Sequence, residues 1–220
     1  MSEWKLVKRE RLAGNLYRDK YVLDPSVTIT GKDVEHAWYG TRSNADTEYG
    51  NPEFADIEFT DTEKQTIDSD DGNRVSHSAS ATQQYKYAEV AHKFLFDTYS
   101  VLPTNVILKS ITYGWDGYAS GYIRKIMRFT RGGWEDTGVS APTSDGSGVE
   151  FEETLTNLDW VLIGGKFKFG VYVSDAYIDS SISVSLHTDY IFLTVTYETS
   201  NLIQTPVINP RVIGVSGYER

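Results

Sequence analysis

Apolar and polar residues alternate along the second half of the chain with the period of two that is typical of half-buried β-strands. Every second residue is apolar from Phe167 to Val173 and from Ile111 to Trp115. Such runs are rich in β-branched and aromatic residues and are bounded by Gly, Asn, Asp, Ser or Pro, as strands and their turns usually are. We therefore predict strands at Gln84–Asp97, Asn105–Asp116, Tyr122–Arg131, Gly148–Thr154, Lys166–Ser174 and Asp189–Glu198.

The turn residues between these runs support the same fold. Asp116-Gly117, Gly132-Gly133 and Gly164-Gly165 tolerate a positive φ, so short loops can join the strands. No segment has a helical period of useful length, and the nearest, Arg11–Tyr21 and Asp159–Ile163, are short or broken by Gly. The pattern predicts an all-β protein, a two-sheet antiparallel β-sandwich with extended N- and C-terminal arms.

The two ends of the chain differ from its middle. We predict an N-terminal extension (1–50), the sandwich (51–200) and an apolar C-terminal arm (201–220). In this arm Pro206 and Pro210 rule out a helix or an uninterrupted central strand. The apolar residues of the arm are Leu202, Ile203, Val207, Ile208, Val212 and Ile213. Such a segment either wraps its own sandwich or docks on another copy as an assembly arm, and the N-terminal extension leaves the same choice.

Three segments of the chain resemble a known family. They are Phe94–Asp97 (FLFD), which leads through Leu102-Pro103 to Ser110–Tyr118 (SITYGWDGY), and Leu186–Tyr197 (LHTDYIFLTVTY). They are similar to carbohydrate-binding-module-like jelly-roll domains of archaeal and bacterial surface proteins and of virion proteins. The resemblance implies a two-sheet jelly roll that is displayed outside cells and sometimes contacts glycans.

Composition limits the partners of the protein. The chain of 220 residues carries 31 Asp and Glu against 21 Lys and Arg, a formal net charge of −10. This charge repels phosphate backbones and anionic membranes, so we expect no nucleic-acid partner. There is no run of about 18 apolar residues, so we expect no membrane span. The charged N-terminus also lacks the apolar stretch of a secretory signal.

Catalytic motifs are missing from the sequence. It contains no Gly-x-Ser-x-Gly, no His-Glu-x-x-His and no cysteine nucleophile. The four histidines, His36, His77, His92 and His187, are far apart in the sequence. We therefore predict no catalytic residues and a protein that is not an enzyme.

The acidic turn 68–73 (DSDDGN) is a candidate calcium site. Asp68, Asp70 and Asp71 offer the hard oxygen ligands that Ca²⁺ prefers, and a structural calcium ion is the only cofactor that the sequence suggests. The spacing departs from that of an EF-hand loop and no Glu closes it, so a solvated hairpin tip is the alternative. Asp97 and Asp189 form a second candidate calcium site if the strand ends that carry them are adjacent.

Aromatic residues near turns are candidate glycan-binding or interface residues, because flat rings stack on sugars and are enriched at interfaces. They are Tyr118, Tyr122, Trp134, Trp38 and Tyr39. Trp115 alternates with Ile111 and Tyr113, so we assign it to the core.

Two functional hypotheses follow. The first is a non-catalytic structural protein of a virus or phage particle (capsid, decoration, turret or tail component) whose partners are other copies of itself or other virion subunits. The second is a glycan-binding module of a cell-surface or secreted protein. They place the protein in a virion or, alternatively, outside the cell or on its surface.

Overall fold

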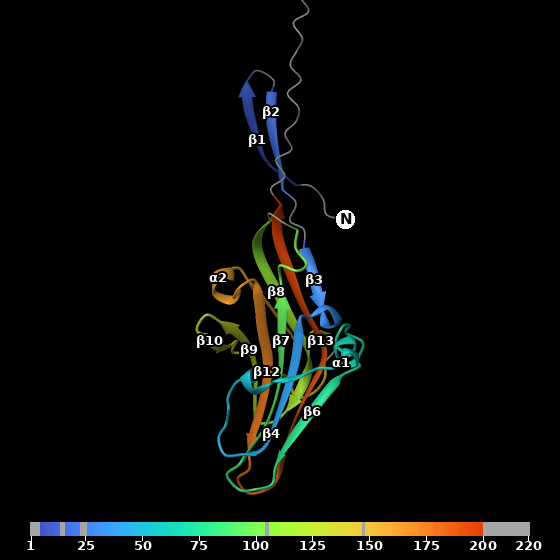
Figure 1. Cartoon of the computed structure of the whole chain (residues 1–220), viewed down its shortest axis with the longest axis vertical. Helices are drawn as coiled ribbons and strands as arrows, with labels where there is room; N and C mark the ends of the chain where they lie inside the picture. Colours follow the sequence, from blue (N-terminus) through green and yellow to red (C-terminus); the bar gives the residue numbers. More distant parts are fainter. Residues whose placement is uncertain (1–4, 14–15, 23–25, 104–105, 147, 200–220) are drawn as a thin grey trace, which may run out of the picture.

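A computed structural model describes residues 5–13, 16–22, 26–103, 106–146 and 148–199 of the chain. Two antiparallel sheets of six and five strands lie face to face, and a separate two-stranded hairpin lies beyond one end of them (Figure 1). The predicted all-β, two-sheet antiparallel sandwich is therefore confirmed. The finer jelly-roll connectivity stays a prediction.

In the six-stranded sheet, several neighbouring strands are far apart in the sequence. Its order is β10 (Gly133–Asp136), β9 (Ile123–Thr130), β12 (Lys166–Ala176), β7 (Tyr87–Asp97), β4 (His36–Ala45) and β5 (Ile57–Glu58). The long strands β7 and β12 form the middle of this sheet and pair over eleven residues, from Tyr87 opposite Ala176 to Asp97 opposite Lys166.

The five-stranded sheet is built around one long strand, β13 (Ile182–Thr199). Along one edge β13 pairs with β8 (Val106–Ser120), which in turn pairs with β11 (Phe151–Leu155). Along the other edge it pairs first with β6 (Val75–Ala81) and then with β3 (Ser26–Thr30).

The core lies between the two sheets and follows the predicted alternation. Ile111, Tyr113 and Trp115 of β8 are fully buried, as are the apolar residues of β12 from Phe167 to Val173. Aromatic rings meet across the interior: the ring centroid of Tyr113 on one sheet is 4.7 Å from that of Phe167 and 5.1 Å from that of Phe169 on the other. Trp115 is thus a core residue, as the sequence indicates.

Short helices lie in the connections. They are η1 (Gly31–Asp33), η2 (Pro52–Phe54), α1 (Asp61–Thr66) and α2 (Leu158–Val161). Helix α1 is not among the elements predicted from the sequence, although its start is encoded locally. The Thr60 side chain accepts a hydrogen bond from the Glu63 backbone, and the Glu63 carboxylate accepts one from the Thr60 backbone, which is a capping box.

The sandwich begins earlier than predicted. Strands β3 and β4 are paired members of the two sheets, so the boundary predicted at residue 50 is wrong. The physical reason is that Ile29 of β3 and Ala37 of β4 are buried and form part of the hydrophobic core between the two sheets. Among the described strands, only those of the hairpin, β1 (Lys5–Ala13) and β2 (Leu16–Val22), stand apart from the sheets, as an N-terminal extension. The predicted C-terminal arm, 201–220, lies outside the described residues.

Candidate functional site

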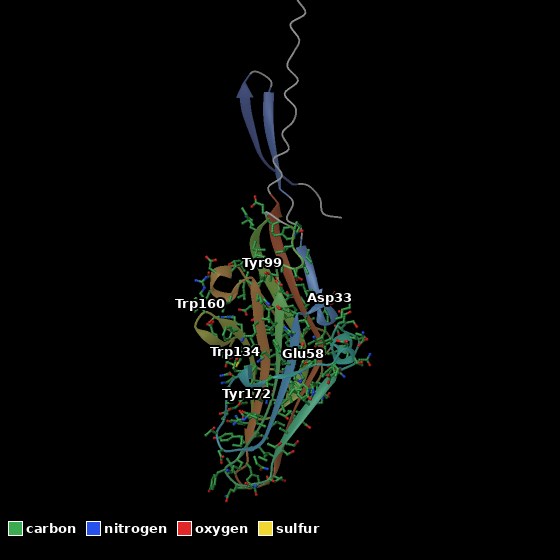
Figure 2. The ribbon with its side chains drawn as sticks, in the orientation of Figure 1. Asp33, Glu58, Tyr99, Trp134, Trp160 and Tyr172 are labelled. Carbon is green, nitrogen blue, oxygen red and sulfur yellow. The ribbon has the colours of Figure 1, made fainter. Side chains whose placement is uncertain are left out.

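Two of the predicted aromatic residues lie on the outer face of the six-stranded sheet. Ala37 and Tyr39 of β4 face the core, so Trp38 between them points outward. Trp134 lies on the edge strand β10 (Figure 2). Both indoles pack against one small buried cluster, formed by Ala55, Ala91, Met127 and Tyr172. Strand pairing thus brings together two residues that are distant in sequence.

A groove of about 240 Å³ runs along this outer face. It is lined by Trp38, Lys93, Leu95, Phe129, Val161, Ile163, Lys166 and Lys168. Pockets that enclose a drug-sized ligand usually measure about 300–1,000 Å³. The groove is therefore suited to a single ring-sized group rather than to a large cofactor.

Lysine ammonium groups lie close to aromatic rings in the groove and at its edge. The Lys168 ammonium lies 3.7 Å from the ring centroid of Phe129 and 5.1 Å from that of Trp134, and the Lys93 ammonium lies 5.0 Å from that of Trp38. Burial lowers the pKa of Lys93. The other two lysines of the groove are paired with carboxylates, Lys166 with Glu35 and Lys168 with Glu53.

Glu53 of η2 fixes the residues at the edge of the groove. Its carboxylate accepts a hydrogen bond of 2.7 Å from the Trp134 indole and lies 3.6 Å from the Lys168 ammonium. Its backbone carbonyl accepts a hydrogen bond from the Lys93 ammonium at 3.2 Å. Sequence reasoning missed Glu53 and the three lysines, because nothing local links them to the tryptophans.

The other predicted aromatic residues do not join this groove. Tyr39 stacks on His77 inside the sandwich, with ring centroids 3.6 Å apart. Tyr118 stacks on His187 at 4.2 Å, next to the Arg74 guanidinium. Tyr122 is 82% exposed in the turn between β8 and β9. The five aromatic candidates therefore do not form a single site.

A chain of hydrogen bonds crosses the core and joins histidines that the sequence places far apart. The Trp115 indole donates to the Thr188 hydroxyl at 2.9 Å, and this hydroxyl lies 2.8 Å from Nδ1 of His92. Nε2 of His92 lies 2.9 Å from Nδ1 of His77, whose Nε2 is 3.7 Å from a Glu63 carboxylate oxygen. Burial, followed by the neighbouring His77, holds the pKa of His92 well below its usual range.

This chain has a hydroxyl and an imidazole in contact, but both are enclosed. Thr188 and His92 are fully buried, so a substrate has no path to the hydroxyl. Each hydrogen has an acceptor when the Trp115 indole donates to the Thr188 hydroxyl and this hydroxyl donates to Nδ1 of His92. Nε2 of His92 then donates to Nδ1 of His77. The chain therefore acts as a structural network of neutral groups.

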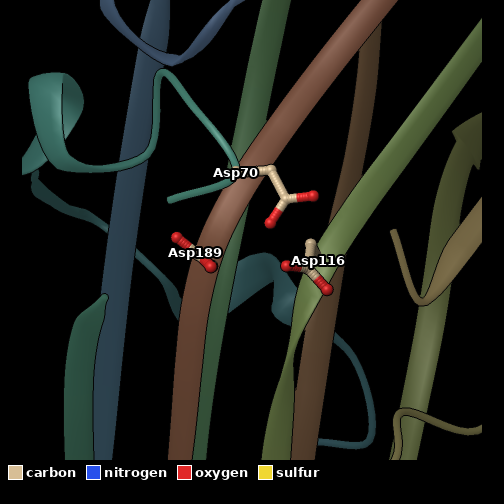
Figure 3. A group of neighbouring side chains, drawn as sticks. All are labelled: Asp70, Asp116 and Asp189. Atoms are coloured by element: carbon tan, nitrogen blue, oxygen red, sulfur yellow. The ribbon is translucent and has the colours of Figure 1, made fainter. Parts of the chain in front are cut away.

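Three aspartates meet on the outer face of the five-stranded sheet. Asp70 comes from the loop between α1 and β6, Asp116 from β8 and Asp189 from β13 (Figure 3). One carboxylate oxygen of each lies within 4.8 Å of the others. A β-bulge explains the position of Asp189: Thr188 pairs with Gly117 and Tyr190 with Asp116, so Asp189 is an extra residue in the ladder.

Burial and neighbouring aspartates raise the pKa values of Asp116 and Asp189. Burial, and then the nearby Asp70 and Asp189, raise the pKa of Asp116 to about 6. Burial also raises the pKa of Asp189, against a hydrogen bond of 3.0 Å that its carboxylate accepts from the Gly72 backbone. Arg74 brings a positive charge, but its guanidinium is 4.0 Å from the Asp189 carboxylate and pairs more closely with Asp145.

The structure separates the three aspartates of the predicted calcium turn. Asp68 pairs with Lys32 at 2.8 Å and accepts a hydrogen bond from Thr30, so it points away from Asp70 toward η1. The Asp71 carboxylate accepts the Asn73 backbone N–H at 3.0 Å. Asp189 meets Asp70 and Asp116 rather than Asp97, which accepts backbone hydrogen bonds from Tyr99 and Ser100. Of the predicted turn, only Asp70 joins the cluster.

No protein-family model matches the chain, and a comparison with curated proteins finds no relative of it.

Within the described ranges, no helix has both the length and the apolar character needed to cross a bilayer.

Proposed function

We propose that the protein is a non-catalytic structural subunit of a virus or phage particle that assembles with other copies of itself. The observation that carries the proposal is the β1–β2 hairpin, whose two strands pair only with each other among the described strands. A lone two-stranded hairpin is marginally stable in water and needs a further strand or a packed surface. A hairpin held outside its own sandwich fits a segment that a neighbouring subunit completes.

Charge supports the same assembly. Residues 5–22 contain six Lys and Arg and two Asp and Glu, a net charge of +4, so the rest of the chain carries −14. The stretch 46–71 contains ten acidic residues and one lysine, and Asp56 and Asp61 in it are exposed. A basic hairpin and an acidic stretch of another copy attract each other, and salt weakens that attraction.

Light scattering across a concentration series tests the proposal. We expect the full chain to form a discrete oligomer or a larger assembly, and deletion of residues 1–25 to give a monomer with the melting temperature of the sandwich unchanged. Lys8→Glu with Arg9→Glu is expected to weaken assembly, whereas the control Lys125→Glu with Arg131→Glu in the sandwich keeps it. A full chain that is monomeric at all concentrations, or a deletion that leaves the mass per subunit and the assembly unchanged, contradicts the proposal.

A second candidate function is glycan binding, and the groove on the outer face favours it. Aromatic rings offer stacking faces for sugars, and the Lys93 ammonium, which donates to a backbone carbonyl, offers a partner for carboxylate or sulfate. Lys166 and Lys168 would exchange their pairing with Glu35 and Glu53 for the ligand's acidic group. We propose that the ligand of this groove is the acidic sugar of a glycan. A structural subunit of a particle can use such a groove to bind a host surface, so the two functions are compatible.

A glycan array that includes sialylated, uronic-acid and sulfated sugars tests this second function. We expect saturable binding that is lost in Trp38→Ala and weakened in Trp134→Ala. Tyr122→Ala is the matched control, because Tyr122 is an exposed aromatic outside the groove. Flat titrations across the array, or equal losses in the control variant, contradict glycan binding in the groove.

A further inference from the structure

The aspartate cluster contains two buried carboxylate oxygens that lack a partner. Oδ1 of Asp116 and Oδ1 of Asp189 are buried and accept no hydrogen bond from the described residues. The two residues are only 2% and 1% exposed. A buried carboxylate oxygen without a donor is unfavourable, and the three carboxylates of the cluster also repel one another. A cation bound between the carboxylates would give these oxygens a partner and remove the repulsion.

The geometry of the three oxygens fits one ion. Figure 3 shows the three carboxylates turned toward one common space between the loop and the two strands. Their ligand oxygens lie within 4.8 Å of one another. Two oxygens that bind one ion at about 2.4 Å can be no more than about 4.8 Å apart, and about 2.3–2.6 Å is the bond length of Ca²⁺ to oxygen. The separations therefore meet the distance condition for one shared Ca²⁺.

The donor set selects a hard cation. All three ligands are carboxylate oxygens, which suit Ca²⁺, Mg²⁺ or Mn²⁺, whereas zinc prefers imidazole and thiolate ligands. Ca²⁺ takes 6–8 oxygens in a flexible geometry, typical of such sites, and Mg²⁺ demands a smaller octahedron. Asp70 is exposed, so water can complete the shell on its side. Flexible coordination with open positions favours Ca²⁺.

We propose that Asp70, Asp116 and Asp189 bind one calcium ion that fastens the loop 67–74 to strands β8 and β13. Two backbone contacts already hold this loop: the Gly72 N–H donates to Asp189 at 3.0 Å, and the Ile191 N–H donates to the Ile67 carbonyl at 3.3 Å. The ion adds a bond from Asp70 to the sheet and removes the repulsion among the carboxylates. Its role is structural, and it is independent of the hairpin and of the groove.

Calorimetric titration of CaCl₂ into the full chain, freed of metal with EDTA and then dialysed, tests the proposal. We expect one ion per chain, and a rise in melting temperature of about 5–10 °C at about 100 times the dissociation constant. Asp70→Asn replaces one carboxylate ligand with a neutral amide oxygen at an exposed position and is expected to weaken binding by about tenfold or more. Asp116→Asn and Asp189→Asn are expected to abolish binding and to raise the melting temperature of the metal-free protein, because they relieve repulsion.

Asp71→Asn is the matched control, since Asp71 is an acidic residue of the same loop that lies outside the cluster. We expect Asp71→Asn to keep the stoichiometry of one ion and an affinity within about threefold of the parent. Three results each overturn the proposal: no heat and no melting shift at millimolar CaCl₂, equal loss of affinity in Asp71→Asn and Asp70→Asn, or tighter binding of MgCl₂ than of CaCl₂.

Discussion

The hydroxyl of Thr188 is the junction of the buried hydrogen-bond chain, so Thr188→Val is the sharpest test of that chain. Valine has nearly the same shape as threonine and leaves the packing in place, but it removes the acceptor of the Trp115 indole and the partner of His92. Thr188 is fully buried, so water cannot replace the lost partner. Each buried polar group left unpaired costs about 1–3 kcal/mol, and the added methyl returns about 1 kcal/mol. With two groups left unpaired, we expect the free energy of unfolding to fall by about 1–5 kcal/mol.

The measurement is urea denaturation at pH 7 in EDTA, followed by tryptophan fluorescence and circular dichroism. Thr188→Ser is the matched control, because it keeps the hydroxyl and loses only a methyl group, for about 1 kcal/mol. The diagnostic result is therefore the order of stability: parent, then serine, then valine. If the valine variant is as stable as the parent, or more stable than the serine variant, the chain makes no net contribution and the reasoning is refuted.

Two further predictions concern acid and the bulge. Because the pKa of His92 is depressed, the folded state binds fewer protons than the unfolded chain. The free energy of unfolding is therefore highest above about pH 6.5, the ordinary pKa of histidine, and falls by about 2 kcal/mol from pH 7 to pH 5. Urea titrations in an Asp116→Asn background measure this, since the raised pKa of Asp116 acts in the opposite direction; equal stability at both pH values contradicts it. Deletion of Asp189 should remove the bulge, keep a cooperative sandwich and abolish the melting shift with CaCl₂, whereas a chain that fails to fold contradicts this account.

The long central strands were predictable because their local pattern and their burial agree. Strands β7, β8 and β12 carry large apolar residues at every second position, and the sheet buries that face. Strand β6 was missed because two of its three buried apolar residues, Ala79 and Ala81, are small, and only Val75 at its start is larger. A strand that fills a narrow part of the core with alanine has no strong hydrophobic period for a sequence to display.

The groove was not predictable because it depends on which strands are neighbours. The alternation around Trp38 indicates that its face is opposite to that of Tyr39, but not that β10, with Trp134, belongs to the same sheet. The chain crosses between the sheets several times between these two residues. Local periodicity contains no information on this order, and the lysines of the groove look like ordinary solvent-exposed residues until β12 is placed beside β9.

The aspartate cluster left one trace in the sequence, a change of phase within β13. Leu186 and Thr188 are buried at even positions, whereas Ile191, Leu193 and Val195 are buried at odd positions, so the alternation skips one residue between the two sets. A regular strand cannot bury both sets on one face, and an inserted residue restores the match. That residue is Asp189. The same bulge sends the Thr188 hydroxyl into the core and the next carboxylate to the outer face, so one extra residue creates both the buried hydrogen-bond chain and the site proposed for calcium.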